Sequence, residues 1–320
     1  MTATTVFSAV HHEHGIVTLD AGYLRPGLAA IHLIIEQGHV ALIDTGVNDS
    51  VPALLACLAA LGLAPEAVDF VIVTHVHLDH AGAAGALMAV CPNARLVVHP
   101  RGARHMISPA KLVAGSVAVY GEARFMALYG EVVPVAEERV IEAHDGLRID
   151  LNGRVLTFLD TPGHARHHVC IHDARSESVF TGDTFGISYR EFDVEGRAFL
   201  YPTTTPVQFE PAALHESIER LLALEPEAAF LTHYGRVGNL PVLAEHLHEL
   251  IDEWSERALE VAGEGPLRQA ALEAALETSL LARLRTHGCT LEESVCRELL
   301  ANDVHLNAQG LLVWRDQAQK

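Results

Sequence analysis

The chain has 320 residues and a formal net charge of -19, from 22 basic and 41 acidic side chains. This acidic balance argues against nucleic acids and anionic membranes as partners, because both require clustered Lys and Arg. The 49% of hydrophobic and 20% of charged residues exclude a disordered chain. The length suits one large domain with an appendage.

The N-terminal segment and the cysteines predict a cytoplasmic protein. Met1–Val6 lacks the basic and apolar stretches of a secretory signal, and no run approaches the roughly 18 apolar residues of a membrane span. The five cysteines form no C-x-x-C pair, which fits reduced thiols better than disulfides. We therefore expect no membrane partner.

Strands are the first elements predicted along the chain. Apolar segments separated by Gly predict strands at Ile16–Asp20, Ala30–Glu36 and His39–Ile43. The third of these strands ends beside the carboxylate of Asp44. An amphipathic helix from about Ser50 to Leu61 follows and is expected to cover one face of the sheet.

The strongest functional signal follows the next predicted strand, Phe70–Thr74. The run His75–His80 reads HVHLDH and contains four metal-capable side chains in six residues. If the chain stays extended there, His75, His77 and Asp79 share one side and the apolar spacers share the other. Imidazole and carboxylate ligands suit zinc, iron or manganese better than calcium or magnesium.

An insertion is predicted after this run. A helix over Ala81–Val90 would let His80 point back toward the same space, and a strand follows at Ala94–His99. Residues 100 to 130 show no strand pattern and are interpreted as an inserted, partly helical segment. Two interpretations remain open, since such a segment can form the wall or lid of a site or can cover a sheet edge.

The second half of the sheet region repeats one pattern. Strands are predicted at Arg139–Ala143, Leu147–Leu151 and Arg154–Leu159, the last two joined by the hairpin turn Asn152-Gly153. Along the chain, five apolar runs end beside a metal-capable side chain: Asp44, His75, His164, Asp183 and His233. Because strand ends converge on one edge in layered α/β folds, we expect these residues to meet there.

The C-terminal region is predicted to be helical. Helices are expected over Pro211–Leu224 and Leu240–Glu260, and the Gly-rich break at Gly263–Pro266 precedes further helical stretches. We divide the chain into a catalytic domain, residues 1–240, and a helical extension, residues 241–320. The extension packs on the core or on a second subunit, so a homodimer formed through these helices remains open.

The motifs resemble those of the metallo-β-lactamase superfamily over about Ile16 to Gly235. HVHLDH matches the hallmark H-x-H-x-D-H, and the segments ending at His164, Asp183 and His233 match the later ligand positions. The resemblance implies an α/β (α+β) fold, an αββα sandwich of two mixed sheets, with two divalent metal ions at one sheet edge. The implied ligands are His75, His77 and His164 for the first ion, Asp79, His80 and His233 for the second, and Asp183 as the bridge, with Asp44 orienting a ligand.

Within the superfamily, the motif order looks like that of a little-characterised group of bacterial and archaeal metal-dependent hydrolases. Asp183 at the bridging position argues against antibiotic hydrolysis. Acyl-homoserine lactonases usually carry a Tyr where this chain has Gly186. The net charge of -19 gives no support for the ribonuclease branches.

The resemblance implies hydrolysis of an ester, lactone, thioester or phosphodiester bond in a small molecule by a hydroxide that bridges two metal ions. Zinc is the first expectation, and iron and manganese remain open. Asp79 is expected to orient the water and move its proton, and Asp44 to fix a ligand, so both are predicted catalytic residues. The candidate substrate contacts are His105, Phe185, Tyr189, Tyr201 and Tyr234, whereas His167 and His168 are interpreted as bystanders.

Two alternatives belong to other functional classes. One is a persulfide-dioxygenase-like enzyme with a single iron on His75, His164 and Asp183. The other is a signalling or interaction protein that keeps a metal site and binds its partner through the C-terminal helices. The complete set of seven implied ligands favours the hydrolase.

Overall fold

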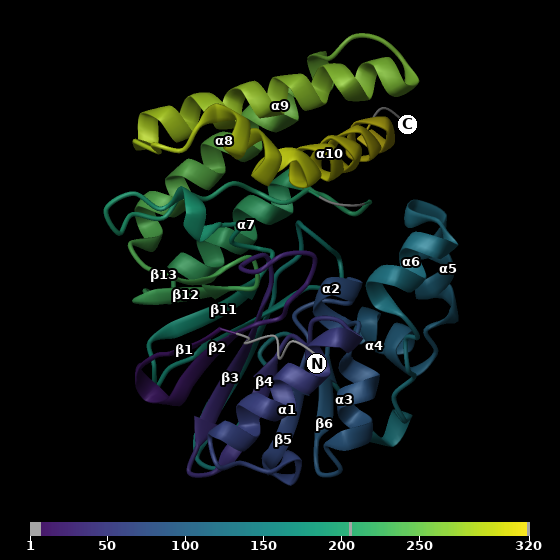
Figure 1. The fold of residues 1–320 in the computed structure, drawn as a ribbon, viewed down its shortest axis with the longest axis vertical. Coiled ribbons are helices and arrows are strands. Elements are labelled where there is room, and N and C mark those ends of the chain that lie inside the picture. Colours follow the sequence, from purple (N-terminus) through teal and green to yellow (C-terminus); the bar gives the residue numbers. More distant parts are fainter. Residues whose placement is uncertain (1–7, 205–206, 319–320) are drawn as a thin grey trace, which may run out of the picture.

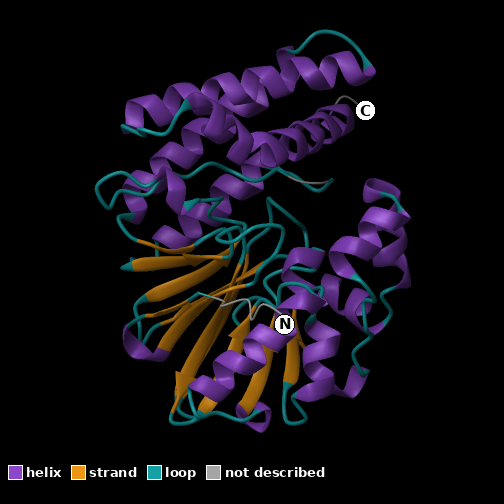
Figure 2. Cartoon of the chain, viewed as in Figure 1, coloured by secondary structure: helices purple, strands orange, loops and turns teal. Residues whose placement is uncertain are grey.

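Two β-sheets lie face to face, with helices on both outer sides (Figure 1, Figure 2). This computed structural model describes residues 8–204 and 207–318, so the outer limits predicted for the two domains, residues 1 and 320, lie outside the described residues. The αββα sandwich and the C-terminal helices expected from the sequence are confirmed.

The first sheet has seven strands in chain order. Neighbouring strands are antiparallel from β1 to β4 and parallel from β4 to β7. The strands are β1 (Ala9–His11), β2 (Ile16–Asp20), β3 (Ala30–Glu36), β4 (His39–Ile43), β5 (Val68–Ile72), β6 (Arg95–Val98) and β7 (Val140–Glu142). The bounds predicted for β2, β3 and β4 are confirmed. The sequence does not predict the three-residue strand β1, which is short and has no buried residue.

The second sheet has six strands in the order β13-β12-β11-β10-β9-β8, and β11 and β12 form its parallel pair. The strands are β8 (Arg148–Leu151), β9 (Arg154–Asp160), β10 (Val169–Asp173), β11 (Ser178–Gly182), β12 (Ala228–Leu231) and β13 (Gly235–Val237). The predicted turn between β8 and β9 is confirmed, since Leu151 pairs with Arg154 and both Asn152 and Gly153 have positive φ.

Apolar side chains from the two facing sheets form the inner core. Ile34, Ile43 and Ile72 of the first sheet are buried with Phe158 and Phe180 of the second. These side chains recur at every second strand position, so each sheet presents one apolar face to the other. The strand ends are thereby fixed relative to one another.

Helices cover the outer faces of both sheets (Figure 1). Helices α1 (Val51–Ala60) and α3 (Ala84–Val90) lie against the first sheet, and α7 (Pro211–Leu222) and α8 (Leu240–Glu260) lie on the side of the second. The helix predicted over Ala81–Val90 is two helices, because a short helix α2 (Leu78–Ala81) begins earlier than expected.

The insertion between β6 and β7 contains three helices at the side of the sandwich (Figure 1). They are α4 (Pro100–Ile107), α5 (Ala110–Tyr120) and α6 (Glu122–Tyr129). Helix α4 packs closely on the core, since a Cβ at Gly102 would lie only 2.8 Å from Cγ1 of Val76.

The C-terminal helices form a layer above the strand ends (Figure 1). Helix α8 ends at Glu260, and α9 (Gly265–His287) and α10 (Glu293–Ala318) follow the predicted break. Trp254 of α8, Leu276 of α9 and Leu311 of α10 belong to the same apolar cluster as the outer faces of the sandwich. One apolar cluster therefore contains side chains from both sides of residue 240, the predicted boundary between the two domains. Among the described residues, no helix combines the length and apolar character needed to cross a membrane.

Candidate metal centre

The HVHLDH run lies between β5 and α2, at the edge where the strands end. The extended path predicted through Asp79 is wrong, because His77 is the last extended residue and α2 begins at Leu78. Val76 and Leu78 are nevertheless both buried, at 1% and 4% exposure. The run thus packs its apolar spacers and turns its polar side chains toward one space.

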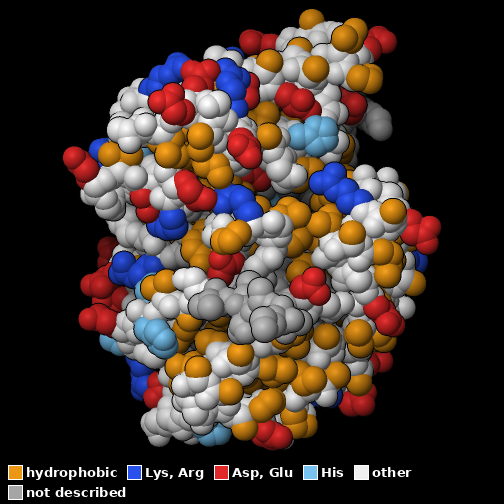
Figure 3. Space-filling view, in the orientation of Figure 1, with side chains coloured by type: hydrophobic (Ala, Val, Ile, Leu, Met, Phe, Trp, Pro, Cys, Tyr) orange, Lys and Arg blue, Asp and Glu red, His pale blue; other side chains and the backbone are white. Residues whose placement is uncertain are grey.

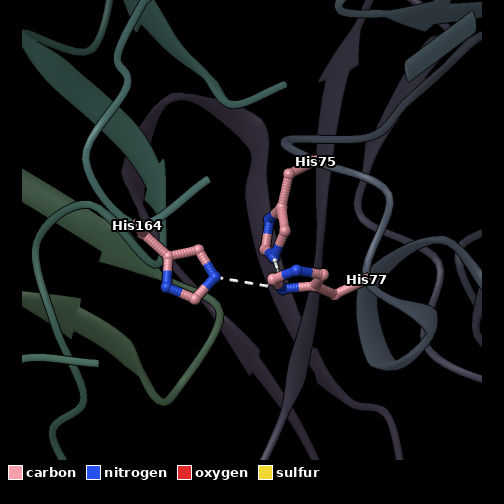
Figure 4. A group of neighbouring side chains, drawn as sticks. All are labelled: His75, His77 and His164. Carbon is pink, nitrogen blue, oxygen red and sulfur yellow. Dashed lines mark hydrogen bonds between the residues drawn. The ribbon is translucent and has the colours of Figure 1, made fainter. Parts of the chain in front are cut away.

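His75, His77 and His164 form the first ligand group, named here the three-histidine cluster (Figure 4). Nδ1 of His77 lies 2.8 Å from Nε2 of His75 and 3.0 Å from Nε2 of His164. Nitrogens about 2.0–2.1 Å from a tetrahedral zinc ion lie roughly 3.3 Å from one another, so these separations fit a shared ion. Burial lowers the pKa of all three imidazoles and favours their neutral, ligating form.

Asp79, His80 and His233 form the second group, the carboxylate cluster. Oδ2 of Asp79 lies 3.7 Å from Nε2 of His80 and 3.4 Å from Nε2 of His233. Burial opposes the protonation of His80, yet the Asp183, Asp79 and Asp44 carboxylates raise its pKa well above the usual value. The pKa of His233 is also raised, because Asp183 and Asp79 outweigh its burial.

Asp183 lies between the two clusters. Its Oδ1 is 3.2 Å from Nε2 of His80, and its Oδ2 is 3.4 Å from Nε2 of His164. Each cluster therefore faces one oxygen of the same carboxylate. The structure brings together all seven side chains that the sequence predicted as ligands.

The donor set fits two divalent metal ions. Nε2 of His80 and Oδ1 of Asp183 are buried polar atoms that make no hydrogen bond within the described residues. Such atoms are costly unless a ligand satisfies them. Mixed imidazole and carboxylate donors suit zinc, iron and manganese, so the residues do not by themselves select one of these metals.

Groups behind the ligands fix their orientation. Oδ2 of Asp44 lies 2.8 Å from Nδ1 of His80 and also accepts a hydrogen bond from Thr232 Oγ1 at 2.6 Å. Nδ1 of His233 donates to the Leu28 carbonyl at 2.7 Å. In the neutral form of both imidazoles, Nδ1 would hold the proton and Nε2 would direct its lone pair toward the site. Asp44 is fully buried and acts only through the groups it touches.

His168, interpreted from the sequence as a bystander, contacts the site. Its Nε2 accepts a hydrogen bond from the backbone N–H of Asp183 at 3.2 Å, and its ring stacks on that of His75 with centroids 4.9 Å apart. His167 lines the cavity above the clusters and also stacks on His75. The sequence spacing of His167 and His168 does not distinguish them from histidines on a loop that has no contact with the site.

A cavity of about 650 Å³ opens above the two clusters. Of the predicted substrate contacts, His105 and Tyr189 line it, while Phe185, Tyr201 and Tyr234 do not. Phe185 and Tyr201 are buried in the apolar core, where the Tyr201 hydroxyl donates to Asp303. An aromatic residue close to a motif in the sequence can therefore lie in the apolar core instead of the cavity wall.

Residues distant in sequence complete the cavity. Tyr23 and Tyr129 line it, and their hydroxyl oxygens lie 2.9 Å apart. Asp303 and Asn307 of α10 form the wall on the side of the C-terminal helices. The insertion contributes through α4, α5 and Tyr129, so it forms a wall of the site. The wall formed by the insertion agrees with one of the two interpretations left open by the sequence, whereas Tyr23, Asp303 and Asn307 had no signal in the sequence.

Comparisons with known proteins agree with this geometry. A family model described as the metallo-beta-lactamase superfamily matches residues 24–233. ST1585, a metallo-beta-lactamase fold-containing protein of Sulfurisphaera tokodaii, is 27% identical over 244 residues, which are 75% of this chain and 85% of that protein. A hydroxyacylglutathione hydrolase of Stenotrophomonas maltophilia is 33% identical over 152 residues, which are 48% of this chain and 44% of that enzyme.

A solved structure shows the same fold over nearly the whole chain. The metallo-beta-lactamase family protein TTHA1429 of Thermus thermophilus superposes with a TM-score of 0.66 at 21% identity, covering 95% of this chain and 94% of that one. The likeness therefore includes most of the C-terminal helices. The match to the Stenotrophomonas hydrolase, in contrast, spans less than half of that enzyme's length.

Proposed function

The chain belongs to the metallo-beta-lactamase superfamily, and from this premise we propose that it is a dinuclear-metal hydrolase that cleaves thioester or related ester bonds in small molecules. The observation that carries the proposal is the pair of clusters joined by Asp183 on the floor of a cavity. The choice of a thioester is supported by the similarity to a hydroxyacylglutathione hydrolase, whose named substrate is an acyl thioester.

Two bound cations would polarise the scissile carbonyl and lower the pKa of a water molecule toward neutrality. The residues around them supply orientation and proton transfer. Asp79 lines the cavity with a side chain that is 22% exposed, so its carboxylate can contact a water molecule. Burial would raise the pKa of Asp79, but His80 and His233 lower it below the usual value, so the group accepts hydrogen bonds at neutral pH.

The hydroxyls of Tyr23 and Tyr129 supply donors on the cavity wall. Burial and then the Asp79 carboxylate raise the pKa of both phenols, so both keep their protons at neutral pH. One hydroxyl can donate to the other and leave the second proton for a substrate oxygen. Asp44 and His168 keep His80 and Asp183 in place from behind.

Metal analysis together with a substrate panel tests this proposal. We expect about two divalent metal ions per chain, hydrolysis of a thioester, loss of activity on chelation and recovery on adding zinc. Two bound ions without hydrolysis of any thioester, ester, lactone or phosphodiester would contradict it. One iron per chain with oxygen consumption on a persulfide would support the dioxygenase-like alternative instead.

A further inference from the structure

We propose that the substrate carries an anionic group, a phosphate or a carboxylate, which binds to four cationic side chains on the cavity wall: Arg101, Arg104, Lys111 and Arg166. These four residues are named the basic rim. The inference rests on the proposed hydrolase function and adds to it the chemical class of the substrate. It would make the molecule an anionic ester or thioester.

All four residues of the basic rim line the cavity that contains the two clusters. Arg101 and Arg104 are three residues apart on α4 and share a face of that helix. Lys111 lies in the first turn of α5. Arg166 follows the ligand His164 by two residues, so a single bound molecule can contact both the rim and the metal centre.

Within residues 8–204 and 207–318, the four rim cations contact no carboxylate closely enough to form an ion pair. This is so although the chain has 41 acidic side chains against 22 basic ones. By contrast, Arg283 and Arg297 in the C-terminal helices each contact two carboxylates. Four cationic side chains without an ion pair among the described residues line one cavity of a strongly acidic protein. This arrangement indicates a binding site for an external anion.

The cavity wall supplies no competing carboxylate to the rim. The acidic residues that line the cavity are Asp79 and Asp183, which belong to the metal clusters, and Asp303. Asp303 is 8% exposed and accepts hydrogen bonds from the hydroxyls of Tyr189 and Tyr201. The carboxylates near the cavity thus already have partners or a role in metal binding.

His105 lines the same cavity as the rim cations Arg104 and Lys111. This residue lies on α4 beside Arg104, and burial, the Arg104 guanidinium and the Lys111 ammonium lower its pKa. The two cations thus act on the same point of the wall and would meet an anion there together. Figure 3 shows basic side chains beside the hollow between the insertion and the C-terminal helices.

The wall next to the rim is apolar. Leu112 and Val119 of α5 and Leu306 of α10 line the same cavity. An apolar acyl group can pack on these side chains while the anionic end contacts the rim and the carbonyl lies over the clusters. Guanidinium groups pair with phosphate and carboxylate in a bidentate manner, so both anions fit the chemistry.

Three butyryl thioesters with different thiol portions test the inference. The thiols are neutral N-acetylcysteamine, 3-mercaptopropionate with a carboxylate, and phosphopantetheine with a phosphate. We expect kcat/KM to be about 10-fold or more higher for an anionic thioester, because charge-assisted contacts are worth roughly that factor each. Preference for the second or the third compound identifies the anion.

Charge-removing variants locate the effect. Arg104→Gln, Lys111→Gln and Arg166→Gln should each lower kcat/KM for the preferred anionic thioester about 10-fold and leave the neutral one within about twofold. Arg148→Gln is the matched control, since Arg148 is exposed, unpaired within the described residues and outside the cavity. High salt should weaken the preference, because the rim is exposed.

A binding measurement separates this inference from the proposed function. The corresponding thioethers cannot be hydrolysed, and calorimetric titration should show tighter binding of the anionic thioethers to the wild-type protein than to Arg104→Gln. Equal binding and equal kcat/KM for neutral and anionic compounds would overturn the inference while leaving the hydrolase intact. Selective binding of the anionic thioethers without hydrolysis of any thioester, ester, lactone or phosphodiester would support the rim and refute the proposed function.

Discussion

The two metal clusters differ in charge although they share Asp183. The three-histidine cluster consists of imidazoles whose pKa values are lowered by burial, so its donor atoms are already neutral. In the carboxylate cluster, burial is outweighed by Asp183 and Asp79, which raise the pKa of His80 and His233. Protons therefore compete with metal in the second cluster and much less in the first. The two adjacent sites should therefore respond differently to a change in pH.

The largest effect is expected from removing a ligand of the three-histidine cluster. His77→Ala should lower metal content and reduce hydrolysis by more than about 100-fold, because Nδ1 of His77 faces both other ligands. Metal analysis and a thioester assay measure both quantities. His144→Ala is the control, since that side chain is 71% exposed and remote from the ligands. Full activity at unchanged metal occupancy would refute the ligand assignment.

The second-largest effect is expected from removing the charge of Asp44, whose carboxylate contacts Nδ1 of His80. Asp44→Asn should weaken metal binding at the carboxylate cluster by about 10–100-fold, because Asp44 contacts His80 directly. The three-histidine cluster should change less, since Asp44 reaches His75 only through the Thr74 hydroxyl. A competition titration with a chelator resolves the two affinities. Thr232→Val keeps the carboxylate but removes its 2.6 Å hydrogen bond, so a smaller change is expected. Equal weakening of both sites would show that the clusters are not distinct.

The pH dependence should differ between the clusters. Below the raised pKa of His80 its imidazolium must lose a proton before binding, so affinity of the carboxylate cluster should rise with pH above about 6.5, by up to about tenfold per pH unit and proton. The three-histidine cluster, with lowered pKa values, should be nearly independent of pH there. Two-site metal titrations at several pH values provide the measurement. Parallel pH profiles for both sites would contradict the charge difference.

The same shift affects the metal-free protein. A raised pKa means that the His80 proton contributes stability that is fully present below about pH 6.5 and is lost as pH rises through the raised pKa. The Tm of the metal-free protein should therefore fall over this range, and bound metal should suppress the decline. A Tm that rises with pH in the metal-free form would show that other groups dominate.

The smallest effect is expected from the C-terminal helix α10. Asn307 accepts a hydrogen bond from Thr204 N at 2.6 Å, and the neighbouring Thr203 carbonyl lies 3.2 Å from Nδ1 of His164. Asn307→Ala should weaken metal binding at the three-histidine cluster only a few-fold, roughly the worth of one hydrogen bond. Asn302→Ala, on the same helix and cavity, is the control. An equal loss of metal affinity in both variants would show that the effect comes from the cavity wall and does not depend on the orientation of His164.

The sequence predicted which metal-capable side chains the fold brings together, because metal chemistry restricts the residue types. Asp183 and His233 could be selected because each follows an apolar run, and strand ends converge. The bounds of β2, β3 and β4 were predictable for a similar reason, since buried strands need continuous apolar residues. By contrast, β13 has three residues and depends on pairing with β12.

Most of the cavity wall could not be predicted, although His105 and Tyr189 were, because the wall depends on long-range packing. Asp303 reaches the site only because α10 packs above the strand ends, and Tyr23 meets Tyr129 across 106 residues of chain. Phe185 and Tyr201 were plausible wall residues by sequence, yet the fold buries them. The start of α2 at Leu78 is a local feature that the assumption of an extended run missed.

The position of Asp183 has a consequence for how the centre fills. Because its two oxygens face different clusters, an ion at one cluster fixes the carboxylate that the other also needs. The occupancies of the two clusters are therefore linked by a coupling free energy, and that linkage is reciprocal. Whatever factor the first ion contributes to the affinity of the second, the second contributes equally to the first. Metal loading is then a property of the pair, and no single affinity describes it.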